Sequence, residues 1–390
     1  MVSVILWIGI FVAVFVGFNI GGSSTGVAFG PAIGSKVITK LAAAGLMTVF
    51  ALLGGWTVGR HVIRTMGGDI VPRTYFSPEA TVGILFFIGF ALLISNLSGV
   101  PASTSMTAVG AIAGLGVASG SINWGVMGRI VSWWIVAPIL AFWVCAVIGR
   151  YFYPYLAHWF AIDQSEGPLV EVRKKGLLPV LTLGENTTYR EFVGSVVVII
   201  IGCYMAFSAG ASNTANAVAP LVGSEQITME QGILLAGGAI GLGAFTIARR
   251  TLETVGNDLT ELPILAALIV EVVSASIITM LSALGIPASL AVSATMCIVG
   301  LGWGRATRTV TLSEAVSGGE QPEVSVNALS AEPSEEGVPR MGEEETRDLI
   351  ESAQLFSPSS TRRVIMLWIF TPSVSAIASY LLFTLFPLYA

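Results

Sequence analysis

The residues best able to bind a ligand lie in two short motifs, each of which occurs twice. The first reads GGSSTGVAFGPAIGS (Gly21–Ser35) and returns as GASNTANAVAPLVGS (Gly210–Ser224). These small, polar and proline residues interrupt apolar sequence, and broken backbone at membrane depth is tolerated only where it is buried in protein or lines a cavity. We therefore expect interrupted helices that bind an ion or its substrate, unless the small residues simply allow close helix packing. The polar candidates are Ser23, Ser24, Thr25, Ser212, Asn213, Thr214 and Asn216.

The second motif reads GVPASTSMTAVGAIAGLG (Gly99–Gly116) and returns as GIPASLAVSATMCIVGLG (Gly285–Gly302). Its proline suits the start of a helix, where the missing N–H costs nothing. The first turn of a helix offers unpaired N–H groups and a partial positive charge, which suit an anion. The second copy carries Leu290 and Ala291 where the first has hydroxyls, so its backbone N–H groups must contribute more. The hydroxyl candidates are Ser103, Thr104, Ser105, Ser289 and Ser293.

One carboxylate, Glu271, lies in the middle of the apolar run LPILAALIVEVVSASIITML. An ionisable side chain inside a membrane segment is costly and indicates function by default. Glu271 is therefore a candidate for binding a coupling cation or proton, together with Asn216, Asn213 and Ser24. A structural hydrogen bond is the alternative for Glu271.

The elements that position these residues must be membrane helices. The chain has 390 residues, of which 11% are charged and 54% hydrophobic, and its mean hydropathy is +0.81. A soluble domain carries about a quarter charged residues. The predicted class is all-α: a polytopic, multi-pass protein of the cell membrane with ten apolar helical segments. We place them at Val4–Ile20, Val37–Val58, Thr81–Ser98, Pro101–Ala118, Val126–Ile148, Phe192–Phe207, Gln231–Ile247, Pro263–Leu284, Pro287–Leu301 and Val364–Leu388.

The chain is a duplicated unit, because Gly21–Ile70 matches Gly210–Leu259 without a gap, at an offset of 189 residues. We expect two inverted repeats, each with a re-entrant helical hairpin whose helix N-terminus points at one central site. The expected division is a first transmembrane repeat (1–150), a polar linker (151–190), a second repeat (191–304), an acidic loop (305–362) and a final helix (363–390).

Metal chemistry and catalysis find little support in the composition. The three cysteines lie in apolar runs, and His61 and His158, the only histidines, lie near predicted helix ends, so no His/Cys cluster forms. A serine hydrolase using Ser103 or Ser23 would need a neighbouring base. We do not expect the chain to be an enzyme, and we expect no cofactor apart from a bound sodium ion.

The acidic loop holds eleven acidic residues between Glu314 and Glu351, against Arg340 and Arg347. Low hydrophobicity and high charge predict a solvated, disordered segment. The alternative is a docking site, which would suit a transporter-like receptor.

Taken together, the motifs resemble those of the PiT family of inorganic phosphate transporters over nearly the whole chain. That family carries a duplicated G-A-N-D-V-A-N-A-x-G segment and a duplicated P-V-S-T-T-H segment. Here the first pair begins Gly21-Gly22-Ser23-Ser24 and Gly210-Ala211-Ser212-Asn213, and the second begins Pro101-Ala102-Ser103-Thr104 and Pro287-Ala288-Ser289-Leu290. The resemblance implies phosphate uptake coupled to sodium ions or protons, with the motif aspartates helping to bind the cation.

The motif aspartates are replaced by Ser24 and Asn213, and of the motif asparagines only Asn216 is retained. We therefore expect fewer cations per anion than the family pattern implies. The expected partners are phosphate or a similar inorganic anion, a coupling cation and the lipid bilayer, with no nucleic acid. Sulfate or another oxyanion is the alternative substrate, and a homo-oligomer is left open.

Overall fold

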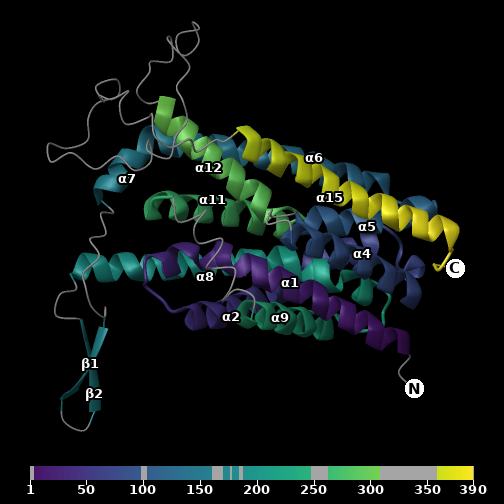
Figure 1. Ribbon diagram of the computed structural model, residues 1–390, viewed down its shortest axis with the longest axis horizontal. Coiled ribbons are helices and arrows are strands. Elements are labelled where there is room, and N and C mark those ends of the chain that lie inside the picture. Colours follow the sequence, from purple (N-terminus) through teal and green to yellow (C-terminus); the bar gives the residue numbers. More distant parts are fainter. Residues whose placement is uncertain are drawn as a thin grey trace, which may run out of the picture.

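The computed structural model of this chain is a bundle of long helices with a small β-hairpin standing apart from it (Figure 1). It describes residues 4–97, 103–159, 170–175, 178–183, 188–246, 262–307 and 358–389. The helices of the first half are α1 (Val4–Gly34), α2 (Lys40–Thr57), α3 (Gly59–Arg64), α4 (Pro78–Leu97), α5 (Thr104–Ala118), α6 (Trp124–Val147) and α7 (Tyr153–Trp159). Those of the second half are α8 (Tyr189–Gly223), α9 (Met229–Thr246), α11 (Ile264–Ala283), α12 (Leu290–Ala306) and α15 (Pro358–Leu385). Short π-helical and 3₁₀ turns lie at η1 (Thr65–Asp69), η2 (Arg73–Tyr75) and η3 (Ile148–Phe152).

The bundle is that of a multi-pass membrane protein, as the composition predicted. Among the described residues, five helical spans are long and apolar enough to cross a membrane. A bilayer core needs roughly 20 apolar residues in a helix. The spans are Val4–Gly34, Lys40–Thr57, Trp124–His158, Glu191–Gly223 and Ile264–Ala283.

The β-hairpin lies in the region expected to be a polar linker. Strands β1 (Val170–Lys175) and β2 (Leu178–Leu183) pair antiparallel, with Val170 opposite Leu183. The alternation of apolar and charged residues over Val170–Arg173 has the period of a strand and would have been a usable signal. The hairpin does not alter the all-helical membrane part.

The contacts between the two repeats have pseudo-two-fold symmetry: a contact made by one repeat has a counterpart in which the two repeats have changed places. Gly21 in α1 faces Ile240 in α9, and a Cβ on this glycine would lie 1.9 Å from the Ile240 carbonyl oxygen. Gly210 in α8 faces Ala51 in α2, where the same distance would be 2.0 Å. The 189-residue offset exchanges these two pairs, since it relates Gly21 to Gly210 and Ala51 to Ile240.

The repeats run in opposite directions. Helix α1 starts at the end of the molecule where the N-terminus lies, whereas α8 starts at the other end, near the β-hairpin (Figure 1). Helix α6 packs on α12 and α15 packs on α5, so the helix that ends each copy lies against the hairpin of the other. The expectation of inverted repeats is confirmed.

Each repeat contributes one helical hairpin, α4–α5 or α11–α12, and the two hairpins occupy opposite ends of the bundle (Figure 1). The first helix of each has 20 residues, whereas α5 has 15 and α12 has 17. The N-termini of α5 and α12 meet inside the bundle, where Thr104 and Ser289 line one cavity. These are the expected re-entrant hairpins.

The prediction of broken helices at the first motif is wrong. Helices α1 and α8 continue through Gly21–Gly34 and Gly210–Gly223, and each contains its proline, Pro31 or Pro220. The hydroxyls of Thr25 and Thr214 each donate to the carbonyl oxygen four residues earlier, at 2.7 Å, so they satisfy the helix rather than interrupt it. The glycines Gly21 and Gly210 of the motif allow close helix packing, which was the alternative interpretation.

The second motif starts its helix later than the proline suggested. Helix α12 begins at Leu290, three residues after Pro287, because Ser289 caps it by accepting a 3.3 Å hydrogen bond from the Val292 N–H. Ser103 caps α5 in the same way, accepting from Met106 at 3.3 Å. Each capping serine satisfies an otherwise unpaired N–H in the first turn of its helix.

The final helix also starts earlier than expected, at Pro358. The acidic stretch from Glu314 to Glu351 lies outside the described residues.

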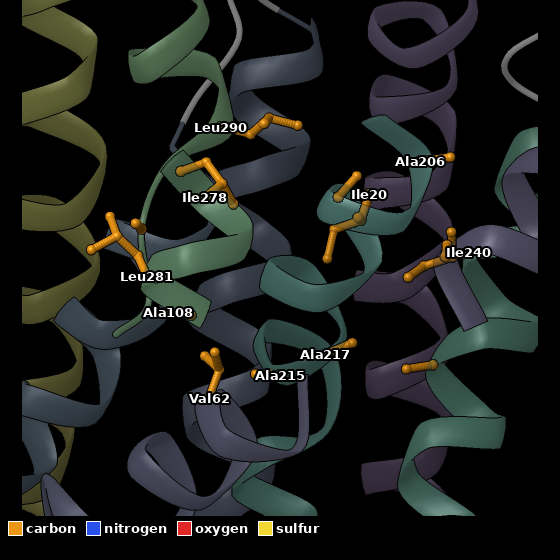
Figure 2. Close-up of a cluster of buried hydrophobic side chains, with 14 of the residues drawn as sticks. Ile20, Val62, Ala108, Ala206, Ala215, Ala217, Ile240, Ile278, Leu281 and Leu290 are labelled. Atoms are coloured by element: carbon orange, nitrogen blue, oxygen red, sulfur yellow. The ribbon is translucent and has the colours of Figure 1, made fainter. Parts of the chain in front are cut away.

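The core between the helices is rich in alanine, including Ala108, Ala206 and Ala215, beside larger residues such as Ile240 (Figure 2). Small side chains at these contacts let the helix backbones approach closely.

Candidate functional site

The site centres on a cavity of about 90 Å³ where the two hairpins meet α1 and α8. Its polar lining comes from both copies of both motifs, with Ser23 and Ser24 on α1, Asn213 on α8, Thr104 at the start of α5 and Ser289 before α12. The remaining lining residues are Asn19, Ile20, Val27, Leu92, Leu290 and Ala291. None of the lining residues is ionisable, so the cavity wall presents neutral hydrogen-bonding groups.

In the cavity wall, Asn213 is held by two hydrogen bonds to its amide oxygen. The Thr104 hydroxyl donates to Asn213 Oδ1 at 2.7 Å, and Asn216 Nδ2 donates to the same oxygen at 3.0 Å. Asn216 Nδ2 also lies 3.2 Å from the Thr104 hydroxyl oxygen and 3.1 Å from that of Ser105. Asn213 is only 6% exposed and Asn216 is fully buried, so this network is shielded from solvent.

A second set of contacts ties the two hairpins to α8. The Ser212 hydroxyl donates to the Ala288 carbonyl oxygen at 2.8 Å and lies 3.3 Å from the Ser105 hydroxyl. Ala288 precedes α12 and Ser105 lies in the first turn of α5. Ser212 therefore lies at the junction of both re-entrant hairpins.

Several predicted site residues lie outside the cavity lining. Ser105, Ser212 and Asn216 form the layer behind it, and Ser103 caps α5. Among the described residues, the hydroxyls of Thr25 and Thr214 bond only to their own helices. Ser293 is buried in the first turn of α12.

Glu271 lies in α11 and is 5% exposed, but it does not line the cavity. Its Oε1 atom has no hydrogen-bond partner among the described residues. A buried carboxylate oxygen without a partner is costly, and a proton or cation would offset that cost. The role of Glu271 in binding the coupling cation or proton stays a prediction.

Four lining residues were not among the residues singled out from sequence: Asn19, Ile20, Val27 and Leu92. Asn19 carried a usable signal, because it is a polar residue in an apolar segment and lies four positions before Ser23, on the same helix face. Ile20, Val27 and Leu92 carried none, since apolar residues are common throughout membrane helices.

The histidines do not approach the cavity serines. His61 lies in α3, where its ring is 3.2 Å from the Val58 carbonyl oxygen, and neither it nor His158 lines the cavity. Within the described ranges, no group of three or more His, Cys, Asp or Glu side chains could hold a metal ion.

Comparison with known proteins places the chain in a family. The model of the phosphate transporter family matches residues 20–379. The chain belongs to the phosphate transporter family. This agrees with the motif resemblance and makes it a member of a family of transporters rather than of enzymes.

The relatives it resembles differ in their named substrates. It is 30% identical to the sulfate permease CysP of Bacillus subtilis (strain 168) over 269 residues, which is 69% of each chain. It is 28% identical to the sodium-dependent phosphate transporter 2 of Xenopus laevis over 29% of this chain and 19% of that one. Its fold matches a solved structure of the sodium-dependent phosphate transporter with a TM-score of 0.64, at 20% identity, over 97% of this chain and 99% of that one.

Proposed function

We propose that this chain is a secondary transporter that carries inorganic phosphate across the cell membrane by alternating access, coupled to a cation. The observation that carries the proposal is the single cavity lined by Ser24, Asn213, Thr104 and Ser289, which come from all four motif copies. A tetrahedral oxyanion needs hydrogen-bond donors on several sides, and convergent helix N-termini supply them.

Alternating access is supported by the inverted repeats. Two copies related by an exchange of contacts can adopt two arrangements of similar energy around one central site. The present arrangement is asymmetric at the cavity, since Ser212 is buried and bonded to Ala288 whereas its sequence mate Ser23 is exposed and lines the cavity.

The negative charge of the proposed substrate supports a coupling cation. Phosphate carries one to two negative charges, and the cavity lining has no ionisable residue to balance them. Moving an uncompensated charge into a low-dielectric site costs several kcal/mol. A sodium ion or proton that moves with the anion would offset this cost. Glu271, Asn216, Asn213 and Ser24 are the candidate ligands from sequence, and Glu271 is favoured among them, because the amide oxygen of Asn213 already accepts from Thr104 and Asn216.

Sulfate is the second candidate, and two observations favour it. CysP, the relative aligned over 69% of this chain, is named a sulfate permease. In addition, the cavity lining lacks a carboxylate that could accept a hydrogen bond from the protonated oxygen of hydrogen phosphate. Fully ionised sulfate carries no such proton and needs only hydrogen-bond donors.

Flux into proteoliposomes tests both candidates. The purified full chain should accumulate labelled phosphate, and unlabelled phosphate should compete better than sulfate. Accumulation of labelled sulfate, with phosphate neither transported nor competing, would replace phosphate with sulfate. Failure to move either anion under sodium and proton gradients would reject oxyanion transport.

A further inference from the structure

We propose that Asn213 donates hydrogen bonds directly to the transported oxyanion, and that Thr104 and Asn216 are positioning residues that orient its amide nitrogen toward the cavity. This inference rests on the proposed function, because it assumes that the cavity binds an oxyanion. It assigns the three polar residues different roles, although all three were candidates for the same site.

The amide oxygen of Asn213 is fully engaged. Thr104 donates to Oδ1 at 2.7 Å and Asn216 donates to it at 3.0 Å, which uses both lone pairs. A carboxamide is planar, so holding its oxygen also fixes its nitrogen. Asn213 lines the cavity, and its Nδ2 forms no hydrogen bond with the residues that the structure describes. Its two N–H groups are therefore left for a ligand.

The opposite orientation of the two amides satisfies fewer groups. If both were turned over, Asn216 would place two buried N–H donors where it now has one buried, unpaired oxygen, Oδ1. Leaving two buried donors unpaired costs more than leaving one acceptor unpaired. The Asn213 oxygen therefore faces the Thr104–Asn216 side and its nitrogen faces the cavity.

The neighbouring groups in the cavity are also donors. The hydroxyls of Ser24 and Ser289 line it and donate to no described residue, and the Ser289 oxygen already accepts from Val292. The start of α12 adds unpaired backbone N–H groups at Leu290 and Ala291. Donors without a carboxylate suit an anion rather than a cation.

Thr104 has a different role, because its hydroxyl proton is used in the bond to Asn213. It also accepts from Asn216 at 3.2 Å. Thr104 therefore affects the anion through Asn213. Removing its hydroxyl should leave the cavity volume nearly unchanged but release the amide of Asn213 from its fixed orientation.

The test measures labelled phosphate and labelled sulfate uptake by the reconstituted full chain, in sodium-containing and sodium-free buffer. Asn213→Ala should raise the KM about tenfold or more, since it removes a hydrogen bond to a charged group. Thr104→Val should raise the KM severalfold with little change in kcat, and Thr104→Ser should restore it. Thr57→Val is the matched control, because the Thr57 hydroxyl is exposed and bonds only to Leu53 of its own helix.

The double variant Thr104→Val/Asn213→Ala distinguishes positioning from direct contact. If Thr104 acts through Asn213, the double variant should have the KM of Asn213→Ala alone. Additive losses, or a Thr104→Ser variant as impaired as Thr104→Val, would overturn the proposal. A wild-type protein that moves neither anion would instead reject the proposed function.

Protection against thermal unfolding provides a second measurement in case a variant does not reconstitute. Phosphate or sulfate should raise the Tm of the solubilised wild-type protein and of Thr57→Val, because a ligand that binds only the folded state stabilises it. Asn213→Ala should lose this shift, and retention of the full shift would contradict the proposal.

Discussion

At the residue scale, the replacement of a family aspartate by Asn213 is the change with the clearest chemical consequence. A carboxylate offers only acceptors, whereas the amide offers two N–H donors. In this chain the amide oxygen is bonded to Thr104 and Asn216, so the nitrogen remains for the cavity. With the role proposed for Asn213, the substitution exchanges the cation ligand implied by the family motif for an anion donor.

Asn213→Asp should reverse that exchange. We expect uptake in sodium-free buffer to fall by about tenfold, because a carboxylate would repel the oxyanion, and sodium to restore much of it by binding the new carboxylate. Uptake measured across a sodium titration gives the dependence, with Asn213→Ala as the control that lacks both charge and amide. An Asn213→Asp protein with wild-type uptake in the absence of sodium would contradict this prediction.

Glu271 is the second residue with a defined expectation. Because it is buried and its Oε1 has no described partner, Glu271→Gln should weaken the dependence of uptake on the coupling cation or proton. The measurement is initial uptake as a function of sodium concentration and of pH. Glu230→Gln is the control, since Glu230 is half exposed and pairs with Arg60 at 3.3 Å. Steep cation dependence that survives in Glu271→Gln would remove this residue from the coupling mechanism.

At the element scale, close helix contacts through glycine hold the two repeats together. Gly21 and Gly210 each face a backbone carbonyl oxygen of the opposite repeat, at positions where a Cβ would clash. At these glycines the backbones of α1 and α9, and of α2 and α8, are in direct contact, with no side chain between them. The small residues of the first motif therefore serve packing on one face of each helix and the cavity on another.

Gly21→Ala should destabilise the protein by about 1–3 kcal/mol, because the new Cβ would lie 1.9 Å from the Ile240 carbonyl oxygen and the helices would have to separate. Gly30→Ala in the same helix is the control, since nothing lies within 4 Å of its Cβ position. That control should be neutral, or stabilising by up to about 1 kcal/mol. Thermal or denaturant unfolding in detergent provides the comparison, and equal stabilities of the two variants would refute the packing argument.

At the scale of the whole molecule, transport should depend on the helical bundle alone. The cavity lining is confined to α1, α4, α5, α8 and α12 and the residue that caps α12. Deleting residues 314–351 should therefore leave the rate of oxyanion uptake within about twofold of the wild type. Proteoliposome flux, corrected for the amount of protein inserted, is the measurement. A loss of flux would instead favour a regulatory or receptor role for the acidic segment.

The sequence alone determined the membrane class and the duplication, and it indicated the two motifs that supply most of the polar cavity lining. The membrane class follows from local composition. The duplication follows from matched residues at a nearly constant offset, such as Gly21 with Gly210 and Ser103 with Ser289. Ser103 and Ser289, which precede α5 and α12, could also have been predicted to be helix N-caps, because capping depends only on the next three or four residues.

Only the tertiary structure decided which polar residues line the cavity and which lie behind it. Thr25 and Thr214 look like site residues in sequence, but a hydroxyl in a helix can bond to its own backbone, and the choice depends on which helix face is covered. The contact between Thr104 and Asn213 joins residues 109 positions apart. No local pattern encodes such a pair, since it arises when hairpins and helices from both repeats pack together.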